Sequence, residues 1–355
     1  MGFFFFRFDE NYGLASTHAL KNKDIPEGGA GKGAILPSIG ATPRLCSEKY
    51  IDAVIDLLIP GKTPGIKESL VDLYDQPELL FFGPDEGTAD MMDWATVHAR
   101  ARGAETSFTT GKSAQTLGGV PHDTRAYGMT SLSIRQYVLG IYKKLGLREK
   151  DITKVQTGGP DDEILLSSDK TVTIIDGSGV LADPAGLNCE ELIRLAKLRV
   201  PVSNFNKSKL SKDEYLVKVE EHDVKLPSGE IVLDGTDFRS EGHLRFKADL
   251  FVPCGGRPEP VNIANMQALF YSEGKPHFKY IVEGANLFLT QQARLFLEKR
   301  KVIVFKDSSI NKGIVVLLID TLELVSLRTF IAGGVTSSSL EVLAGLALST
   351  QEYVD

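Results

Sequence analysis

The chain has 355 residues, of which 42% are hydrophobic and 25% are charged, so its composition is that of a globular protein and excludes wholesale disorder and fibrous repeats. A chain of this length is expected to form two domains, because domains usually contain about 100–200 residues. Forty basic and 47 acidic residues give a net charge of −7, which disfavours nucleic acid or an anionic membrane as the main partner, since both require clusters of lysine and arginine.

The first part of the chain contains two clear helix patterns. Residues 51–59 carry apolar side chains at helical spacing and end at Pro60-Gly61. Residues 134–145 show the same spacing before Gly146, which we expect to cap the helix in a left-handed conformation. The four phenylalanines at 3–6 are typical of a buried strand, so we expect the natural protein to begin further upstream.

The rest of the chain alternates strand and helix patterns. Short β-rich runs predict buried strands at residues 152–157, 171–176, 248–253, 279–282 and 302–305. Asn188 and Glu191 have the spacing of a helix N-terminus. Because helical stretches separate the strands, we expect a parallel sheet with helices on both faces. Residues 215–234 alternate around Pro227-Ser228-Gly229 and predict a hairpin.

The expected domain boundary lies where this β-rich pattern begins. The first domain is then residues 1–147 and the second is residues 148–355. A hairpin excursion from the second domain is expected over residues 213–236.

A glycine-rich loop surrounds Lys32 in residues 26–33. Glycine permits close backbone approach, so a lysine held there can be pressed against a small ligand. Burial or neighbouring cations would lower the pKa of Lys32, giving a polarising group or a proton donor. The loop is not a phosphate-binding P-loop, because Gly33 stands where Ser or Thr is required. A flexible surface loop is the alternative.

A candidate general base follows two aromatic residues. Phe81 and Phe82 precede a proline-fixed turn that would place Asp85 or Glu86 at the end of a buried strand. Apolar neighbours would raise the pKa of a carboxyl group there. Ordinary turn and N-cap roles are the alternative for both residues.

A third motif has some features of a dinucleotide-binding βαβ unit. Gly158 and Gly159 follow a predicted strand, and Asp176 lies 18 positions after Gly158, close to the spacing of a ribose-binding carboxylate. However, the motif has only two glycines, and Asp161 and Asp162 stand where a phosphate would bind. By itself the motif is a weak signal.

Other site classes are not indicated by the sequence. The six histidines show no HExxH or HxxxH pairing, so no catalytic metal is expected. The cysteines at 46, 189 and 254 are widely spaced, which predicts neither disulfides nor a structural zinc site and indicates a reducing compartment. No GxSxG motif supports a serine hydrolase.

Several segments together match the pattern of a known family. They are residues 27–33, 83–94, 110–130, 176–187, 253–256, 282–286 and 333–338. They include Gly83-Pro84-Asp85-Glu86-Gly87-Thr88 and Val282-Glu283-Gly284-Ala285-Asn286. The chain resembles the glutamate dehydrogenase family, most closely its large NAD-specific fungal members. This resemblance implies an α/β fold, in which a partial substrate-binding α/β domain precedes a Rossmann-like, doubly wound NAD-binding domain.

The resemblance also implies roles for particular residues. The family oxidatively deaminates L-glutamate to 2-oxoglutarate and ammonia, with a hydride passing to NAD. Lys32 would bind substrate and polarise its carbonyl or imine, and Asp85 would carry the proton to and from the amino group. Ser338 would bind the side-chain carboxylate, and Asp176 would bind the adenosine ribose, where its charge favours NAD over NADP. The other cofactor-binding residues would be Thr124, Gly158, Gly159, Gly255, Asn286 and Asn311.

The chain departs from the family pattern in several places. The family's upstream basic motif and its C-terminal helices are not seen, and Gly31 is an extra glycine in the lysine loop. Arg125-Ala126 interrupts the segment expected at the nicotinamide, and residues appear lost between Asp161 and Glu163. Residues 314–333 form an apolar insertion. We therefore expect a fragmentary gene product with a translated intron and a splice slip, which sequencing of the transcript would test.

Three functional readings remain open. The chain is an NAD-dependent glutamate dehydrogenase, an inactive fragment or regulatory pseudo-subunit of the same fold, or a related dehydrogenase for leucine, valine or phenylalanine. Because the phosphate-binding loop is short, we predict weak or absent NAD binding by this chain. The expected partners are small molecules and further copies of the chain, and the expected location is cytoplasmic or mitochondrial, not secreted.

Overall fold

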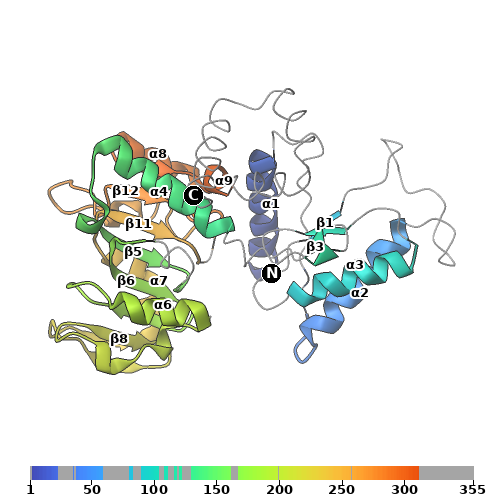
Figure 1. Cartoon of the computed structure of the whole chain (residues 1–355), viewed down its shortest axis with the longest axis horizontal. Coiled ribbons are helices and arrows are strands. Elements are labelled where there is room, and N and C mark those ends of the chain that lie inside the picture. The colour runs from blue at the N-terminus through green and yellow to red at the C-terminus, as the bar shows by residue number, and fades with distance from the viewer. Residues whose placement is uncertain are drawn as a thin grey trace, which may run out of the picture. The chain divides into compact units, whose positions relative to one another are not determined.

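The computed structural model describes most of the second half of the chain and parts of the first (Figure 1). The described residues are 2–22, 35, 37–58, 80–82, 89–103, 108–110, 116–117, 120–121, 129–160, 167–198, 200–256 and 258–311. The chain divides into two compact units, residues 1–7 with 31–129 and residues 8–30 with 130–355, and each is described by itself. No helix among the described residues is long and apolar enough to cross a membrane.

The N-terminal segment is helical. Helix α1 covers Gly2–Asn22, so the strand predicted for the phenylalanines at 3–6 is wrong. The strand preference of phenylalanine reflects packing on a half-buried sheet surface, and its intrinsic cost in a helix is below about 1 kcal/mol. A phenylalanine run can therefore continue a helix that its neighbours favour.

Where it is described beyond residue 31, the first unit contains helices and short strands. Its elements are α2 (Pro43–Leu58), α3 (Ala89–Ala101), the parallel pair β1 (Leu80–Phe82) and β2 (Phe108–Thr110), and the antiparallel pair β3 (Thr116–Leu117) and β4 (Val120–Pro121). Helix α2 confirms the predicted helix and begins earlier, because Thr42 caps it with a hydroxyl that accepts from the Leu45 amide at 3.4 Å. Its apolar stripe is buried, with Ile51 2% and Ile55 1% exposed.

Ionic contacts join α2 to α3. Asp52 lies 2.7 Å from His98 Nε2 and 3.2 Å from Arg102 Nη1, and Arg102 also pairs with Asp56. The hydrogen bond from His98 lowers the pKa of Asp52, with Arg102 adding to the effect. Trp94 stacks on the His98 ring with 4.6 Å between ring centres, so the imidazole contacts Trp94 through a face and Asp52 through Nε2.

The second unit is built on a seven-stranded sheet. In spatial order its strands are β13 (Ile303–Phe305), β12 (Tyr280–Val282), β11 (Leu250–Pro253), β5 (Thr153–Thr157), β6 (Lys170–Asp176), β7 (Gly179–Ala182) and β8 (Tyr215–Lys218). The five predicted strands are confirmed and run parallel. The predicted burial of the last is wrong, because β13 lies at the edge of the sheet, where Ile303 is exposed. Strand β7 runs antiparallel to both of its neighbours, β6 and β8. It reverses direction after β6 because the two-residue turn at Gly177-Ser178 is too short for a crossover.

Helices cover both faces of this sheet, as predicted. They are α4 (Met129–Leu145), α6 (Cys189–Leu198), α7 (Gly235–Arg245), α8 (Gln291–Lys299) and the short α9 (Asp307–Ile310), all labelled in Figure 1. Successive strand residues face opposite sides. Val252 packs in the cluster with α4, whereas Phe251 packs with α8. Likewise Ile174 packs with α6 and Ile175 with α7.

Helix α4 ends in the predicted glycine cap. Gly146 has φ +65°, and the amides of Gly146 and Leu147 donate to the carbonyls of Lys143 and Tyr142 at 3.4 and 2.9 Å. This is the Schellman arrangement of a helix C-terminus. The helix packs on the sheet of the second unit, although the sequence places it before the predicted boundary at 147, which stays a prediction.

The predicted hairpin is confirmed in part. Strands β9 (His222–Lys225) and β10 (Ile231–Asp234) pair antiparallel around the turn at 227–229. The start of the predicted excursion, Tyr215–Lys218, is instead β8, the edge strand of the main sheet. Asp234 then caps α7 by accepting from the Asp237 amide at 3.0 Å.

Candidate functional site

Two glycine backbones cross where β5 and β11 end. A Cβ at Gly158 would lie 2.6 Å from the Gly255 nitrogen, and a Cβ at Gly255 would lie 2.7 Å from Gly158 Cα. Gly158 also has φ +99°, a conformation that other residues rarely adopt. From β5 the chain continues to β6 on one side, while β11 to β13 lie on the other. The crossing is therefore the point of strand-order reversal, where open α/β sheets bind ligands.

Asp176, at the end of β6, lies beside this crossing. A Cβ at Gly159 would lie 3.5 Å from Asp176 Oδ2, and Asp176 is only 7% exposed. Its Oδ1 accepts from the Ser178 amide and hydroxyl at 2.8 and 2.7 Å, and its Oδ2 accepts from the Val202 amide at 2.8 Å. A carboxylate offers about four acceptor positions, so roughly one remains for a ligand hydroxyl.

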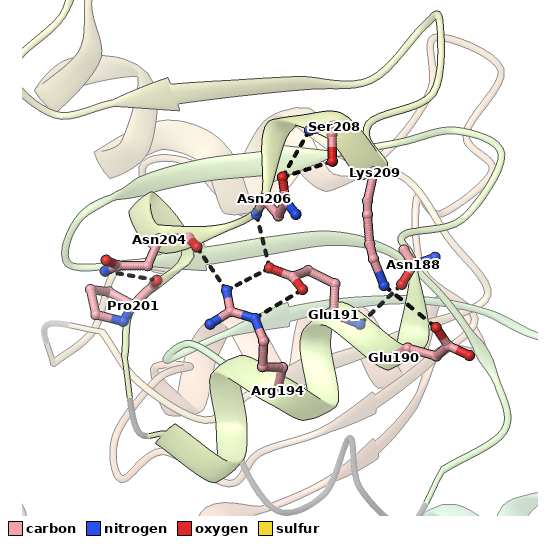
Figure 2. Close-up of polar contacts among 9 residues, drawn as sticks. All are labelled: Asn188, Glu190, Glu191, Arg194, Pro201, Asn204, Asn206, Ser208 and Lys209. Atoms are coloured by element: carbon pink, nitrogen blue, oxygen red, sulfur yellow. Dashed lines mark hydrogen bonds and ion pairs between the residues drawn. The ribbon is translucent and has the colours of Figure 1, made fainter.

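Side chains of α6 hold in place the segment whose Val202 amide donates to Asp176. Figure 2 shows the Glu191 carboxylate receiving two hydrogen bonds from Arg194, at 2.9 and 2.6 Å, and one from the Asn206 amide at 2.9 Å. Arg194 also donates to the Asn204 carbonyl at 3.0 Å. The side chain of Glu191 is 3% exposed, and its pKa is lowered chiefly by the bond from Arg194. This clamp fixes the turn that carries the Val202 amide.

Two asparagines meet at the ends of β12 and β13. Asn311 donates from Nδ2 to Asn286 Oδ1 at 3.3 Å, to the Gly284 carbonyl at 3.2 Å and to the Asp307 carbonyl at 2.9 Å. Asn311 is 3% exposed, whereas Asn286 is partly exposed. Asn286 is thus presented at the same sheet edge as the glycine crossing, with its amide oriented by Asn311.

Two buried carboxyl groups hold the loop that carries Asn286. Glu283 and Asp307 are each 1% exposed; Glu283 accepts from the Leu289 amide and Asp307 from the Leu287 amide, both at 2.8 Å. Leu287 has φ +58°, an unfavourable conformation for a bulky residue that these bonds maintain. Burial and the charge of Asp307 raise the pKa of Glu283 to about 8, so Glu283 is mostly protonated at neutral pH.

The structure brings six of the predicted cofactor residues to one edge of the sheet: Gly158, Gly159, Asp176, Gly255, Asn286 and Asn311. The other predicted site residues, Lys32, Asp85, Thr124 and Ser338, lie outside the described residues. So do the predicted irregularities at Gly31, at 125–126, at 161–163 and at 314–333. In the part of the chain that is described, no group of three His, Cys, Asp or Glu side chains could hold a metal ion.

Comparison with known proteins agrees with this geometry. Residues 118–326, more than half of the chain, match the family described as Glutamate/Leucine/Phenylalanine/Valine dehydrogenase. The chain belongs to this family.

Its relatives are much longer proteins. A Neurospora crassa protein named NAD-specific glutamate dehydrogenase is 54% identical over 358 residues, which cover 98% of this chain and 32% of that protein. A Saccharomyces cerevisiae protein of the same name is 49% identical over 366 residues, covering 98% and 31%. The chain therefore spans about a third of the length of these relatives.

Solved dehydrogenase structures share the fold. Plasmodium falciparum glutamate dehydrogenase superposes with a TM-score of 0.55 at 15% identity, covering 94% of this chain and 64% of that one. The hetero-hexameric glutamate dehydrogenase of Thermus thermophilus gives 0.54 at 17% identity, covering 95% and 70%. At such low identity the likeness confirms the α/β, Rossmann-like fold expected from the sequence.

The sequence interpretation missed the residues that support this site. Glu191 was noted only as part of a helix start, and its carboxylate is used by Arg194 and the Asn206 amide. Asn188 does cap the helix as predicted, accepting from the Glu191 amide at 3.0 Å. Asp307 carried no local signal, because its partners Leu287 and Glu283 lie at least 20 residues away.

We expect Glu191→Ala to destabilise the fold by about 2 kcal/mol, because it leaves the Arg194 guanidinium and the Asn206 amide without their acceptor. Urea unfolding measures the difference. Glu190→Ala is the matched control, since that side chain is 86% exposed and its pairing with Lys209 at 3.4 Å contributes little. Equal stabilities of the two variants would contradict the clamp.

We expect Glu283→Gln to weaken the dependence of stability on pH. A carboxyl group whose pKa is raised by folding stabilises the fold while protonated, and this contribution is lost as pH rises from 4.5 towards about 8. Glutamine still accepts from the Leu289 amide but cannot ionise, so near pH 8 the variant should be more stable by roughly a few kcal/mol.

Urea unfolding between about pH 5 and about pH 8.5 measures this difference in slope. A residual slope is expected in both proteins, because burial raises the pKa of Glu214 to about 7. If the free energy of unfolding has the same slope against pH in Glu283→Gln and in the wild type, Glu283 does not titrate as described.

Proposed function

We propose that this chain is part of an NAD-dependent glutamate dehydrogenase, which converts L-glutamate to 2-oxoglutarate and ammonia. The main structural support for this proposal is the crossing of Gly158 and Gly255 at the switch point of the sheet, with Asp176 at the end of the next strand. The names of the Neurospora crassa and Saccharomyces cerevisiae relatives support the substrate and the cofactor.

The residues at this edge fit a dinucleotide. Because Gly158 and Gly255 carry no Cβ, the two strand ends approach each other closely and bring both loop backbones to the switch point where a dinucleotide would bind. The remaining acceptor position of Asp176 suits a ribose hydroxyl, and its negative charge would repel a 2′-phosphate, which favours NAD over NADP. The partly exposed Asn286, oriented by Asn311, would bind the nicotinamide half.

The catalytic steps are proposed on the family resemblance. Lys32 would polarise the substrate carbonyl or imine, Asp85 would transfer the amino-group proton, Ser338 would bind the distal carboxylate, and Thr124 would bind the cofactor. Assembly as a homo-oligomer and a cytoplasmic or mitochondrial location belong to the same proposal. The related Thermus thermophilus enzyme is described as a hetero-hexamer.

Absorbance of NADH during incubation with NAD tests the activity and separates the alternatives. A glutamate-dependent rise supports the proposal, and no rise with any amino acid favours an inactive fragment or pseudo-subunit. A rise with leucine, valine or phenylalanine but not with glutamate would overturn the assignment of substrate.

A further inference from the structure

A cavity of about 420 Å³ opens at the amino ends of the central strands, the edge opposite the proposed cofactor site. Thr153 begins β5, while Asp249 and Lys279 immediately precede β11 and β12. The full lining is Thr153, Lys247, Ala248, Asp249, Tyr271, Lys275, Pro276, His277 and Lys279. Its size lies within the usual range for small-molecule sites, about 300–1,000 Å³.

The lining is strongly basic within an acidic chain. It contains three lysines and one carboxylate, whereas the whole chain carries a net charge of −7. Both oxygens of the Asp249 carboxylate have partners within the chain. Its Oδ1 lies 2.7 Å from Lys279 Nζ, and its Oδ2 accepts from the Thr153 amide and hydroxyl. Lys275 lies 3.9 Å from the exposed Glu273, which leaves it weakly paired.

An aromatic wall accompanies these cations. Lys247 Nζ lies 4.2 Å from the Tyr271 ring centre, and Tyr271 meets the His277 ring edge-on at 4.8 Å. Burial lowers the pKa of His277, and the positive charge of Lys247 lowers it further. The imidazole therefore lies beside the positive charge of Lys247, in a cavity whose carboxylate, Asp249, is paired with Lys279.

We propose that this cavity binds an organic phosphate, with the phosphate held by Lys247, Lys275 and Lys279 and the organic part packed against Tyr271 and Pro276. Lysines bind a phosphate through charge-assisted hydrogen bonds. A concave, partly apolar wall packs against the organic part of the molecule. The site is separate from the proposed NAD site, because the two lie at opposite ends of the same parallel strands.

The test uses the full chain, ¹³C-labelled in histidine, and phenyl phosphate as the probe. Phenyl phosphate carries no adenine, so it does not mimic the adenosine half of NAD. The His277 signal, assigned with His277→Gln, is titrated against pH with and without the probe at constant ionic strength. Bound phosphate should raise the pKa of His277.

Charge variants decide whether the site is specific. Lys247→Gln should weaken phenyl phosphate binding roughly threefold or more and should itself raise the pKa of His277, and Lys275→Gln should weaken binding similarly. Lys225→Gln, on the exposed hairpin strand β9, removes the same charge away from the cavity and should change neither. An unchanged His277 titration at saturating probe, or equal weakening by Lys225→Gln, would overturn the proposal. Inorganic phosphate binding as tightly as phenyl phosphate would refute the role of the aromatic wall.

Discussion

Gly158→Ala is expected to lower the free energy of unfolding by about 3 kcal/mol or more. The new methyl group would lie 2.6 Å from the Gly255 nitrogen and 2.7 Å from the Cys254 carbonyl carbon, and both atoms are backbone. The substitution would also force alanine to φ +99°. Relief requires separating the ends of β5 and β11, which the Cys254 amide joins by donating to the Thr157 carbonyl at 2.9 Å.

Gly140→Ala is the matched control. Gly140 lies within α4, and a Cβ there would meet no atom within 4 Å. Alanine lowers the entropy of the unfolded chain, so this variant should be more stable by about 0.5–1 kcal/mol. Urea unfolding followed by circular dichroism measures both variants. A stability of Gly158→Ala within about 0.5 kcal/mol of wild type would show that the two strand ends do not cross as described.

Asp169→Ala is expected to cost about 3–5 kcal/mol, because it leaves a buried lysine charge without its partner. Lys154 Nζ lies 2.9 Å from Asp169 Oδ1, and both side chains are 0% exposed. Lys154 also donates to the Ser167 hydroxyl at 3.0 Å, and the Tyr142 hydroxyl donates to Asp169 Oδ2 at 3.2 Å. The two opposite charges therefore neutralise each other where neither side chain reaches solvent.

The double variant Lys154→Met with Asp169→Leu tests whether the loss of stability comes from the unpaired charge that the single variant leaves. Removing both charges leaves none unpaired, so most of the loss in Asp169→Ala should be recovered. Thermal unfolding of the single and double variants gives the comparison. A single variant that loses less than about 1 kcal/mol would mean that Lys154 reaches solvent.

The strands and their order along the chain could be predicted because their signals are local. Ile174 and Ile175 are adjacent apolar residues that face opposite helix layers, as expected of a strand buried on both sides. Gly146 and Asn188 marked helix ends through hydrogen bonds to groups within a few residues. Helix α7 was missed, because Gly235–Arg245 has no clear apolar stripe.

The supporting contacts of the site could not be predicted in the same way. Asp176 was found by its spacing from Gly158, but its bond to the Val202 amide joins residues 26 positions apart. Lys154 in the middle of a strand pattern gave no sign of its partner Asp169. Such pairings depend on the register of the sheet, which single-sequence periodicity does not contain.

Mapping NADH binding onto the chain by ¹H–¹⁵N NMR tests the proposed dinucleotide site most directly. The short phosphate-binding loop predicts weak or absent NAD binding; a working dinucleotide site requires at least weak binding, which this method detects. Added NADH should shift the amide signals of Gly158, Gly159, Gly255 and Asn286, at the carboxyl edge of the sheet, while that of Lys225 in strand β9 stays unchanged. Shifts confined to the opposite edge, or none at millimolar NADH, would contradict the site, whereas micromolar affinity at the predicted amides would contradict only the expected weakness.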